Sequence, residues 1–549
     1  MFRISKPYCF WNPSLQRKNQ VSILLFGTDG IRGKVSLGPC SDPIEALVND
    51  RKITPDLLWL VGQVLSMKTK KPSRVVIGWD NRPDNPLLVQ ALANALDDGD
   101  VEVILAGICA TPALHGASLL NQCHFGCMIT ASHNPVQDSG IKIFNKNGLK
   151  TTPEQEIEIS QLANDLWQEE IGELIPENYK PLSTYAHFDA DGLHQQEIEN
   201  LLQTSDIQPH SQISNPLFID SSKGAAASWL TKHLSSVGIE AVEVSKDAKA
   251  LNQNCGAGEL SPGQRWSLDN VKKESHLLIK SISLHHDFNE LPPKSLVGVA
   301  LDGDGDRCLG VITNESGYEV IDGDLMGYLI TRNMESKSTL AASIESDLAL
   351  KLHIQNLHCD NQVIQTAVGD RWLSYALMEA YTESNAENGA EMLPLLIGIE
   401  DSGHLVMPRK HPLIEGQWCL VGDGVRCMIR LLQVIAKGDF KEFPSSGFKK
   451  RVSVKPFNRK LWDGKNELSK NIENLIQSNH PSATRTYIDG ENNLLLMQAE
   501  GFSIGIRNSG TEEKISISLR LIEHGGHEIF LTTMEKIKQK LTEKMSELS

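Results

Sequence analysis

The stretch VVIGWDNRPDNPLLVQALANALDDGDVEVILA, residues 75–106, decides the fold class. It opens with an apolar strand at 75–78, continues with apolar residues at helical spacing over 87–96, and closes with a second strand at 101–106. A strand, a helix and another strand in succession are typical of parallel strands with helices packed on the faces of the sheet. The stretch therefore predicts an α/β fold.

The same alternation continues on both sides. Strands are predicted at 21–26 and 125–129, and a helix begins after Thr54, a suitable N-cap that is followed by Pro55. The pattern then recurs twice along the chain. One unit contains the segments 217–219, 224–234 (a helix), 239–244 and 296–301, and the next contains 325–330, 340–344, 348–354, 362–368, 395–399 and 425–435 (a helix).

The C-terminal part follows a different pattern. Apolar residues alternate with small ones over 502–506 and 515–519, which predicts an antiparallel pair, and a helix is expected at 529–545. We therefore predict three consecutive α/β domains with mixed, mostly parallel sheets and a C-terminal α+β domain. Their bounds are 21–165, 166–322, 323–445 and 446–549, preceded by an N-terminal extension at 1–20 that lacks the apolar core of a secretory signal.

The composition is that of a globular protein, with 22% charged and 40% hydrophobic residues among 549. A net charge of −16 argues against nucleic acid or a membrane as the main partner. Ten cysteines favour a reducing cytoplasm over a disulfide scaffold. We expect Cys123 and Cys127 to be buried, with a metal knuckle as the alternative. The polar segments 166–212 and 247–294 are expected to include surface insertions without chemistry.

Three aspartates directly follow the strand predicted at 296–301, in Asp302-Gly-Asp304-Gly-Asp306-Arg307. Carboxylates this close repel one another unless a cation holds them, and a hard divalent cation such as Mg²⁺ is the natural choice. An EF-hand loop is excluded because Arg307 stands where its sixth residue would be glycine. The alternative is a solvated acidic turn.

Ser132 lies in a polar loop after the strand at 125–129, Thr130-Ala-Ser132-His133-Asn134-Pro135. Backbone amides and a protonated His133 would neutralise a phosphoryl group on this hydroxyl. Lys142 would serve as a proton acceptor or a phosphate clamp. An ordinary turn and a solvated lysine are the alternatives.

The third unit carries Glu400-Asp401-Ser402-Gly403-His404 after the strand at 395–399. Glu400 and Ser402 offer groups that can bond neighbouring sugar hydroxyls, and His404 suits proton transfer near neutral pH. A loop histidine with only structural bonds is the alternative. Asp370 and Arg371 form either an ion pair at a helix start or contacts to a substrate.

Two further polar segments stand out in the sequence. Arg507-Asn508-Ser509-Gly510-Thr511, between the strands of the C-terminal pair, combines an arginine with hydroxyls and successive amides, with a plain hairpin turn as the alternative. Gly27-Thr-Asp29-Gly30-Ile-Arg32-Gly33 is a glycine-rich turn that matches neither GxxxxGK[ST] nor GxGxxG. The Arg507 segment therefore predicts a phosphate contact, whereas the glycine-rich turn is a weak signal on its own and carries no nucleotide fingerprint.

In this order, the segments FGTDGIRG, TASHNP, GIKIF, DGDGDR, GIEDSGH and RNSGTE resemble the α-D-phosphohexomutases, over residues 26–520. The resemblance implies a four-domain enzyme with a central cleft, an isomerase that interconverts hexose 6-phosphates and hexose 1-phosphates. It implies small sugar phosphates as partners and a hexose 1,6-bisphosphate as intermediate and activator. Whether the enzyme is a monomer or a homodimer stays open.

Residue roles follow from the resemblance together with the residues themselves. Ser132 is expected to be a phosphoserine and, with Asp302, Asp304 and Asp306, to bind one Mg²⁺. The expected catalytic set is Ser132, His133, Lys142, Arg32, Arg307 and His404. The expected substrate-binding set is Glu400, Ser402, Asp370, Arg371, Arg507, Asn508, Ser509, Gly510 and Thr511.

FGTDGIRG, the ITPD that follows it and VGDR resemble phosphoglucosamine mutases more than phosphomanno- or phosphoglucomutases. Glucosamine 6-phosphate is therefore the expected substrate, with those two activities as alternatives and Asp370 as a hypothetical ligand of the C2 ammonium. Two other hypotheses compete. A haloacid-dehalogenase-like phosphatase would use Asp302 as nucleophile but needs Thr or Val where Asp306 stands. A non-catalytic sugar-phosphate binder is opposed by the intact serine and aspartates.

Overall fold

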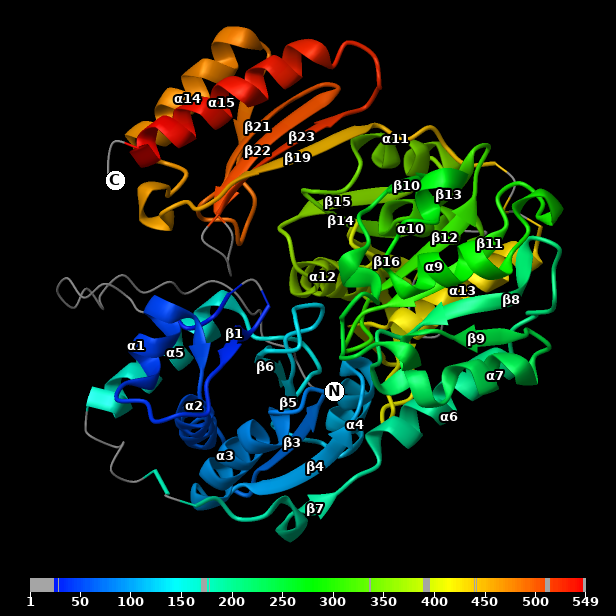
Figure 1. Cartoon of the computed structure of the whole chain (residues 1–549). Coiled ribbons are helices and arrows are strands. Elements are labelled where there is room, and N and C mark those ends of the chain that lie inside the picture. Colours follow the sequence, from blue (N-terminus) through cyan, green and yellow to red (C-terminus); the bar gives the residue numbers. More distant parts are fainter. Residues whose placement is uncertain are drawn as a thin grey trace.

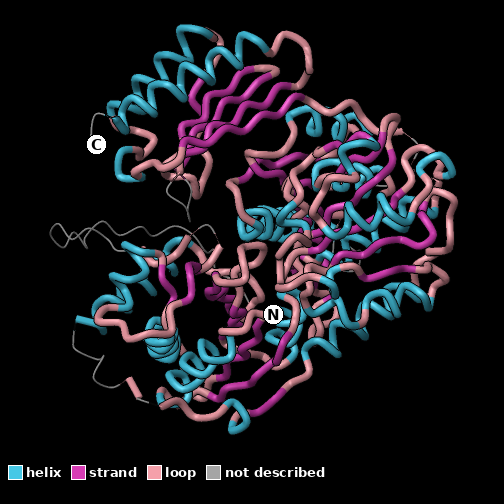
Figure 2. The backbone as a smooth tube through the Cα atoms, viewed as in Figure 1, coloured by secondary structure: helices cyan, strands magenta, loops and turns pink. Residues whose placement is uncertain are grey.

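The structure, a computed structural model, describes residues 24–27, 29–168, 175–176, 178–334, 337–388, 395–438, 440, 442–508 and 514–546. Four β-sheets follow one another along this part of the chain, and helices alternate with strands through the first three (Figures 1 and 2). The predicted fold class is confirmed. The expected N-terminal extension, 1–20, lies outside the described residues.

The first sheet has the strand order β2-β1-β6-β5-β3-β4-β7. The opening stretch forms β3 (Arg74–Trp79), α3 (Asn85–Asp98) and β4 (Glu102–Ile108), and β3 and β4 are parallel, as predicted. β5 (Phe125–Ile129) pairs in parallel with β3 and antiparallel with β6 (Asp138–Asn145). The other elements are β1 (Ile31–Val35), α1 (Pro43–Asp50), β2 (Lys52–Ile53), α2 (Pro55–Met67), α4 (Thr111–Leu120), α5 (Pro153–Gln168) and β7 (Ala186–His187).

The strand predicted at 21–26 is wrong in its described part. Residues 24–27 form no strand; Leu25 and Phe26 are instead buried in the first core, and the Leu25 N–H donates to Ser160 Oγ on α5. The strand begins only after Gly30, which has a φ of +82°. A Cβ on Gly30 would lie 2.2 Å from the Ile141 carbonyl oxygen, so only glycine allows β1 to approach β6 at this turn.

The second sheet has the order β10-β13-β12-β11-β8-β9, parallel from β11 to β9 and antiparallel elsewhere. The predicted helix at 224–234 is a 3₁₀ turn at Ala225–Ser228 followed by α7. The bounds are α6 (Ala190–Gln203), β8 (Ile213–Asp220), α7 (Leu230–Ser236), β9 (Ala241–Glu243), β10 (Arg265–Ser267), α8 (Leu268–Val271), α9 (Leu277–His285), β11 (Leu296–Leu301), β12 (Cys308–Thr313) and β13 (Gly317–Ile321).

The segment 247–294 is more than a surface insertion. It supplies β10, α8 and α9, and its residues Trp266, Leu278 and Ile279 are buried in a core under the second sheet. The expectation of surface insertions therefore does not hold for these elements. Their apolar residues are spread over short pieces that give no clear helical or strand period.

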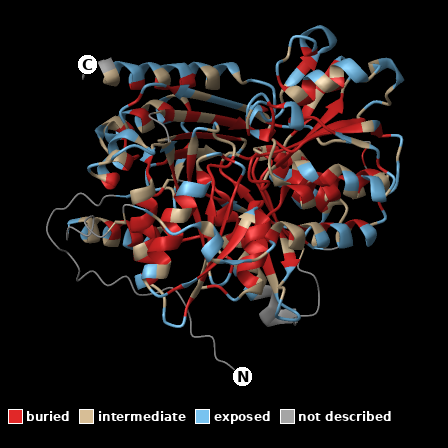
Figure 3. Cartoon of the chain, turned by 60° about the horizontal axis from the view of Figure 1, so that its bottom comes forward, coloured by how far each residue is buried: buried red, intermediate tan, exposed pale blue. Residues whose placement is uncertain are grey.

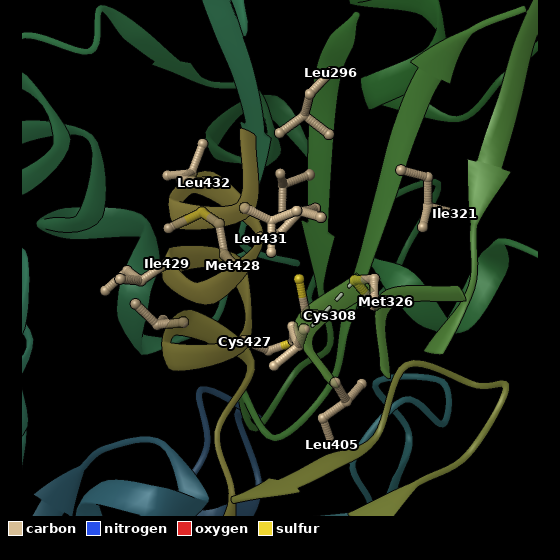
Figure 4. Packing of buried hydrophobic residues seen from close by; sticks show 14 of the residues in the cluster. Leu296, Cys308, Ile321, Met326, Leu405, Cys427, Met428, Ile429, Leu431 and Leu432 are labelled. Atoms are coloured by element: carbon tan, nitrogen blue, oxygen red, sulfur yellow. Dashed lines mark hydrogen bonds between the residues drawn. The ribbon is translucent and has the colours of Figure 1, made fainter. Parts of the chain in front are cut away.

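The third sheet has the order β15-β14-β16-β17-β18. Its elements are α10 (Gly323–Arg332), β14 (Thr339–Ser343), α11 (Leu348–Leu357), β15 (Gln362–Thr366), α12 (Asp370–Asn388), β16 (Leu396–Ile399), β17 (Leu405–Lys410), β18 (Trp418–Gly422) and α13 (Gly424–Ala436). One hydrophobic core joins the second and third units: Leu431 on α13 and Met326 on α10 pack with Leu296 and Cys308 (Figure 4). These two units therefore hold each other in place.

The fourth sheet, β19-β23-β22-β21-β20, is antiparallel throughout, as predicted for its central pair. Its elements are β19 (Phe448–Val454), α14 (Glu467–Asn479), β20 (Thr484–Thr486), β21 (Leu495–Ala499), β22 (Phe502–Asn508), β23 (Ile515–Leu521) and α15 (Glu528–Ser546). Figure 1 shows α14 and α15 on the outer face of this sheet, so its other face is turned toward the rest of the molecule.

Buried residues gather on the strands and on the inner faces of the helices (Figure 3). Cys123 and Cys127 are among them, as expected. The division into domains stays a prediction: α5 spans the boundary placed at 165, and β7 joins the first sheet. Within the described residues, no helix combines the length and the apolar character needed to span a bilayer.

Candidate active site

The polar segments singled out in the sequence meet in one cleft of about 1000 Å³. All four sheets contribute to it through residues on strands or on the loops that follow them. Of the predicted site residues, those that line the cleft are Arg32, His133, Arg307, Asp370, Glu400, His404, Arg507 and Asn508.

Ser132 and the aspartates lie in contact, although they come from different units. The Ser132 Oγ donates to Asp302 Oδ2 at 2.7 Å, and both residues are buried. The loops themselves approach closely, since a Cβ on Gly303 would lie 2.8 Å from the Ser132 carbonyl oxygen. The Ser132 hydroxyl is therefore positioned at the edge of the loop that carries Asp302, Asp304 and Asp306 (the acidic loop).

The backbone of Ser132 is held in a strained conformation. Its φ is +53°, in the left-handed region that non-glycine residues rarely adopt. Two buried side chains fix its carbonyl oxygen: Arg82 Nη2 donates to it at 2.9 Å and Asn252 Nδ2 at 2.7 Å. Both also donate to the Asn134 carbonyl at 2.9 Å, so they hold the whole loop around the hydroxyl.

The three aspartates form a compact set of oxygen donors. Asp302, Asp304 and Asp306 each place a carboxylate oxygen within 4.8 Å of the others. Lys142 Nζ donates to Asp304 Oδ2 and Asp306 Oδ2, both at 2.6 Å. The Oδ1 atoms of Asp304 and Asp306 are buried and have no hydrogen-bond partner. Hard, desolvated oxygens without a donor fit a Mg²⁺ ion.

Charges within the cluster shift its pKa values in opposite directions. Burial, together with the neighbouring carboxylates, raises the pKa of Asp302 to about 7. Burial acts on Asp304 in the same direction, but the Lys142 ammonium holds its pKa below the ordinary value. Burial would lower the pKa of Lys142, yet the carboxylates of Asp304 and Asp306 raise it well above its usual range. Lys142 is thus a permanent cation at the acidic loop.

A chain of ion pairs runs from the first unit to the third. Asp29 pairs with Arg32 at 2.6 Å and with Lys150 at 2.7 Å, and Lys150 pairs with Asp370 at 2.6 Å. His404 Nε2 lies 3.3 Å from Asp370 Oδ2. Burial disfavours the imidazolium of His404, but Asp306 and Asp370 raise its pKa to about 9.

The pKa of His133, which also lines the cleft, is shifted in the opposite direction. The Arg307 guanidinium, burial and Arg32 hold the pKa of His133 well below its ordinary value. The cleft therefore contains one charged and one neutral imidazole at neutral pH. A pair of this kind can both donate and accept a proton.

The predicted sugar-binding residues are only partly brought together. Glu400 lines the cleft and accepts the Gly369 N–H at 2.7 Å, whereas Ser402 is not among the lining residues. Arg371 also lies outside the cleft, where its Nη1 donates to Glu156 Oε1 at 2.5 Å. Of the two alternatives for Asp370 and Arg371, a mutual ion pair is not formed, because each has a partner in the first unit.

The fourth unit presents Arg507 to the cleft. Its Nη1 lies 3.4 Å from Glu491 Oε1 and its Nη2 lies 3.4 Å from Glu345 Oε1. The Asn508 amide donates to the carbonyls of Arg459 and Trp462, so it serves the local fold. The predicted residues Ser509, Gly510 and Thr511 lie outside the described residues.

Sequence reasoning missed several residues of the site, among them Arg82, Asn252, Lys150 and Glu345. Arg82 carried a usable signal, because Asp80 and Arg82 follow β3 just as the other polar segments follow their strands. Asn252 carried none, since it lies in the weakly periodic segment 247–294. Lys150 and Glu345 are single charged residues whose partners are far away in sequence.

Comparison with known families accounts for this arrangement. Two family models match the chain, described as phosphoglucomutase/phosphomannomutase alpha/beta/alpha domain I, at residues 24–169, and domain III, at residues 322–447. A phosphoglucosamine mutase of Lactobacillus delbrueckii subsp. bulgaricus is 28% identical over 443 residues, 76% of this chain and 82% of the relative. One from Prochlorococcus marinus is 27% identical over 527 residues, 94% of this chain and 98% of the relative.

Solved structures share the fold over nearly the whole chain. A phosphoglucomutase/phosphomannomutase family protein of Burkholderia thailandensis has a TM-score of 0.61 at 17% identity, covering 94% of this chain and 98% of its own. Aspergillus fumigatus N-acetylphosphoglucosamine mutase, in complex with GlcNAc-6P and magnesium, has a TM-score of 0.52 at 14% identity, covering 94% and 95%. The family models and relatives, together with the order of the cleft segments, establish that the chain belongs to the α-D-phosphohexomutases, a family of isomerases that move a phosphoryl group within hexose phosphates.

Proposed function

We propose that this hexose phosphate mutase works through a phosphoserine at Ser132 and a hexose 1,6-bisphosphate, with glucosamine 6-phosphate as its preferred substrate. The observation that carries the proposal is the 2.7 Å contact between Ser132 Oγ and Asp302 Oδ2 beside two unpartnered carboxylate oxygens. Complexes of the Aspergillus fumigatus enzyme with magnesium and with glucose 1,6-bisphosphate support it by analogy.

The reaction we propose has two half-reactions. In the first, a sugar hydroxyl oxygen bonds to the phosphorus, the bond from phosphorus to Ser132 Oγ breaks, and the hydroxyl proton passes to a base in the cleft. The bisphosphate then turns round, Ser132 Oγ bonds to its other phosphorus, the bond from that phosphorus to the sugar oxygen breaks, and the base in the cleft returns the proton to this oxygen. Because the same serine serves both half-reactions, the two ends of the sugar must be handled alike by one reaction centre and one distal clamp.

Phosphoryl transfer depends on positioning and charge neutralisation more than on covalent chemistry. One Mg²⁺, bound by Ser132, Asp302, Asp304 and Asp306, would supply positive charge at the transferred group. Lys142 and Arg307 add fixed positive charge, and Arg32, His133 and His404 are our candidates for proton transfer. Arg507 would hold the phosphate that does not react, since arginine suits phosphate oxygens.

The preference for an amino sugar rests on the curated relatives, which are named phosphoglucosamine mutases. Glu400 remains our candidate for contact with the sugar hydroxyls. Asp370 already pairs with Lys150 and lies 3.3 Å from His404, which argues against our hypothesis that it holds the C2 ammonium. The names of the matching family models favour glucose or mannose phosphate as the second candidate. A cytoplasmic location stays a prediction.

The test is a substrate panel with Mg²⁺ and a trace of the matching 1,6-bisphosphate, using glucosamine, N-acetylglucosamine, glucose and mannose 6-phosphates. We expect glucosamine 6-phosphate to have the highest kcat/KM. Ser132→Ala should lower turnover by ~10³-fold or more, because the nucleophile is lost. Intact mass should show one phosphoryl group on the wild type and none on the variant.

Ser316→Ala, at an exposed turn, is the matched control and should keep full activity. A Ser132→Ala enzyme that still hydrolysed sugar phosphates would instead support the phosphatase with Asp302 as nucleophile. An enzyme that binds sugar phosphates but turns over none of the panel would support the non-catalytic binder.

A further inference from the structure

The carboxylate of Glu345 already lies between Arg451 and Arg507, in the part of the cleft that the fourth unit lines. Glu345 Oε1 is 3.4 Å from Arg507 Nη2, and Glu345 Oε2 accepts from Arg451 Nη2 at 2.7 Å. All three residues line the cleft. Each oxygen of one carboxylate thus faces a different guanidinium group.

The backbone explains why the three side chains meet. Glu345 follows β14 at its carboxyl end, and its N–H donates to Ser343 Oγ. Arg451 on β19 and Arg507 on β22 flank β23, where they pair with Ser518 and Ser516 respectively. Figure 1 shows these three strands side by side, with α14 and α15 on the opposite face of the sheet. The open face of the fourth sheet therefore carries two arginines, and the third unit supplies the anion between them.

We propose that Glu345 competes with the non-reacting phosphate of the substrate (the distal phosphate) for Arg507. We also propose that Arg451 is a second phosphate-binding arginine beside Arg507. The proposal rests on the function proposed above and adds a residue that sets how tightly the substrate phosphate is held. Guanidinium groups bind carboxylates and phosphates in the same geometry, so the two anions contend for the same donors. Glu345 is only 13% exposed, which limits screening of its charge by water.

Competition between Glu345 and the phosphate for the two arginines suits the reaction. The bisphosphate must leave the distal clamp between the two half-reactions, so that its other end can reach Ser132. A carboxylate that returns to Arg507 lowers the barrier to this release, because the arginines never face the cleft unpaired. Uniformly tight binding of the phosphate would lower KM but slow the turn.

Binding of inorganic phosphate, measured by calorimetry on the whole chain, tests the proposal without requiring turnover. Glu345→Gln keeps the shape of the side chain and removes its charge. We expect it to tighten phosphate binding about threefold to tenfold, in line with the loss of one partly buried competing charge. The KM for glucosamine 6-phosphate should fall by a similar factor and kcat should fall with it. Glu315→Gln, at an exposed turn, is the matched control.

Arg451 separates the two parts of the proposal. Arg451→Gln alone should weaken phosphate binding, and adding it to Glu345→Gln should cancel the gain. Unchanged or weaker phosphate binding in Glu345→Gln would overturn the proposal, since Glu345 would then merely orient Arg507. If Glu345→Gln tightens phosphate binding as expected but the wild-type enzyme turns over no hexose phosphate, the role of Glu345 is supported and the proposed function is contradicted.

Discussion

His115 shows at the scale of one residue how burial makes an ionisable group matter for stability. It lies fully buried on α4, edge-on to Phe144 with ring centroids 5.7 Å apart. Burial, and then the positive charge of Arg409, lower its pKa to about 3; His411 and Lys150 act in the same direction. All three of these neighbours disfavour the imidazolium, so the folded chain holds the neutral ring.

This depressed pKa predicts a loss of stability in mild acid. The neutral ring is favoured in the folded state relative to an unfolded pKa near 6.5, so its contribution is complete above pH 6.5 and is lost as the pH falls toward 3. Between pH 7 and pH 5 the loss should be roughly 2 kcal/mol. His115→Gln should therefore show a smaller drop in thermal midpoint between these two pH values than the wild type does. His358→Gln, on the exposed surface, should show the wild-type drop; the same drop in His115→Gln would refute the assignment.

At the scale of elements, buried strands were the most predictable part of the chain. β5 and β11 have the expected bounds, Phe125–Ile129 and Leu296–Leu301, because an apolar run ends where its polar loop begins. The acidic loop and the Ser132 loop could be placed for the same reason. The contacts that fix the Ser132 loop could not be placed, since Asn252 reaches it only through the packing of the second unit against the first.

The Ser132 loop supplies the prediction at this scale. Asn252→Asp keeps the size of the side chain but removes the amide that donates to the carbonyls of Ser132 and Asn134. A carboxylate facing these carbonyls repels them, so the strained loop should relax. We expect kcat to fall about tenfold or more, as when a small displacement spoils a near-attack geometry, with a smaller change in KM. Asn356→Asp, exposed on α11, controls for the added charge; equal kinetics in the two variants would contradict the role of Asn252.

At the scale of the whole molecule, the sequence predicted four units but not how they are joined. Lys449 is one residue that joins the fourth unit to the rest of the molecule. It lies on β19, and its Nζ is 2.7 Å from Asp324 Oδ2 and 3.3 Å from Oδ2 of both Asp322 and Asp401. Burial would lower the pKa of Lys449, but the three carboxylates hold it well above its usual range. One ammonium of the fourth unit thus binds three carboxylates that lie at the end of the second unit and in the third.

Removing this ammonium should loosen the docking of the fourth unit. Lys449→Met removes the ammonium from three carboxylates, of which Asp401 keeps another cation nearby, Arg451 at 3.8 Å. Because Lys449 is partly exposed, the loss of stability should be smaller than the roughly 3–5 kcal/mol that breaking a fully buried ion pair from one side costs. We expect a lower thermal midpoint and a larger radius of gyration by small-angle X-ray scattering. Because Asp401 follows Glu400 in the cleft, the KM for sugar phosphate should also rise. Adding Asp324→Asn should restore part of the stability, since one uncompensated charge is removed. Lys450→Met, at the exposed neighbouring residue, is the control. If the two variants have the same thermal midpoint and radius of gyration, Lys449 does not hold the fourth unit in place.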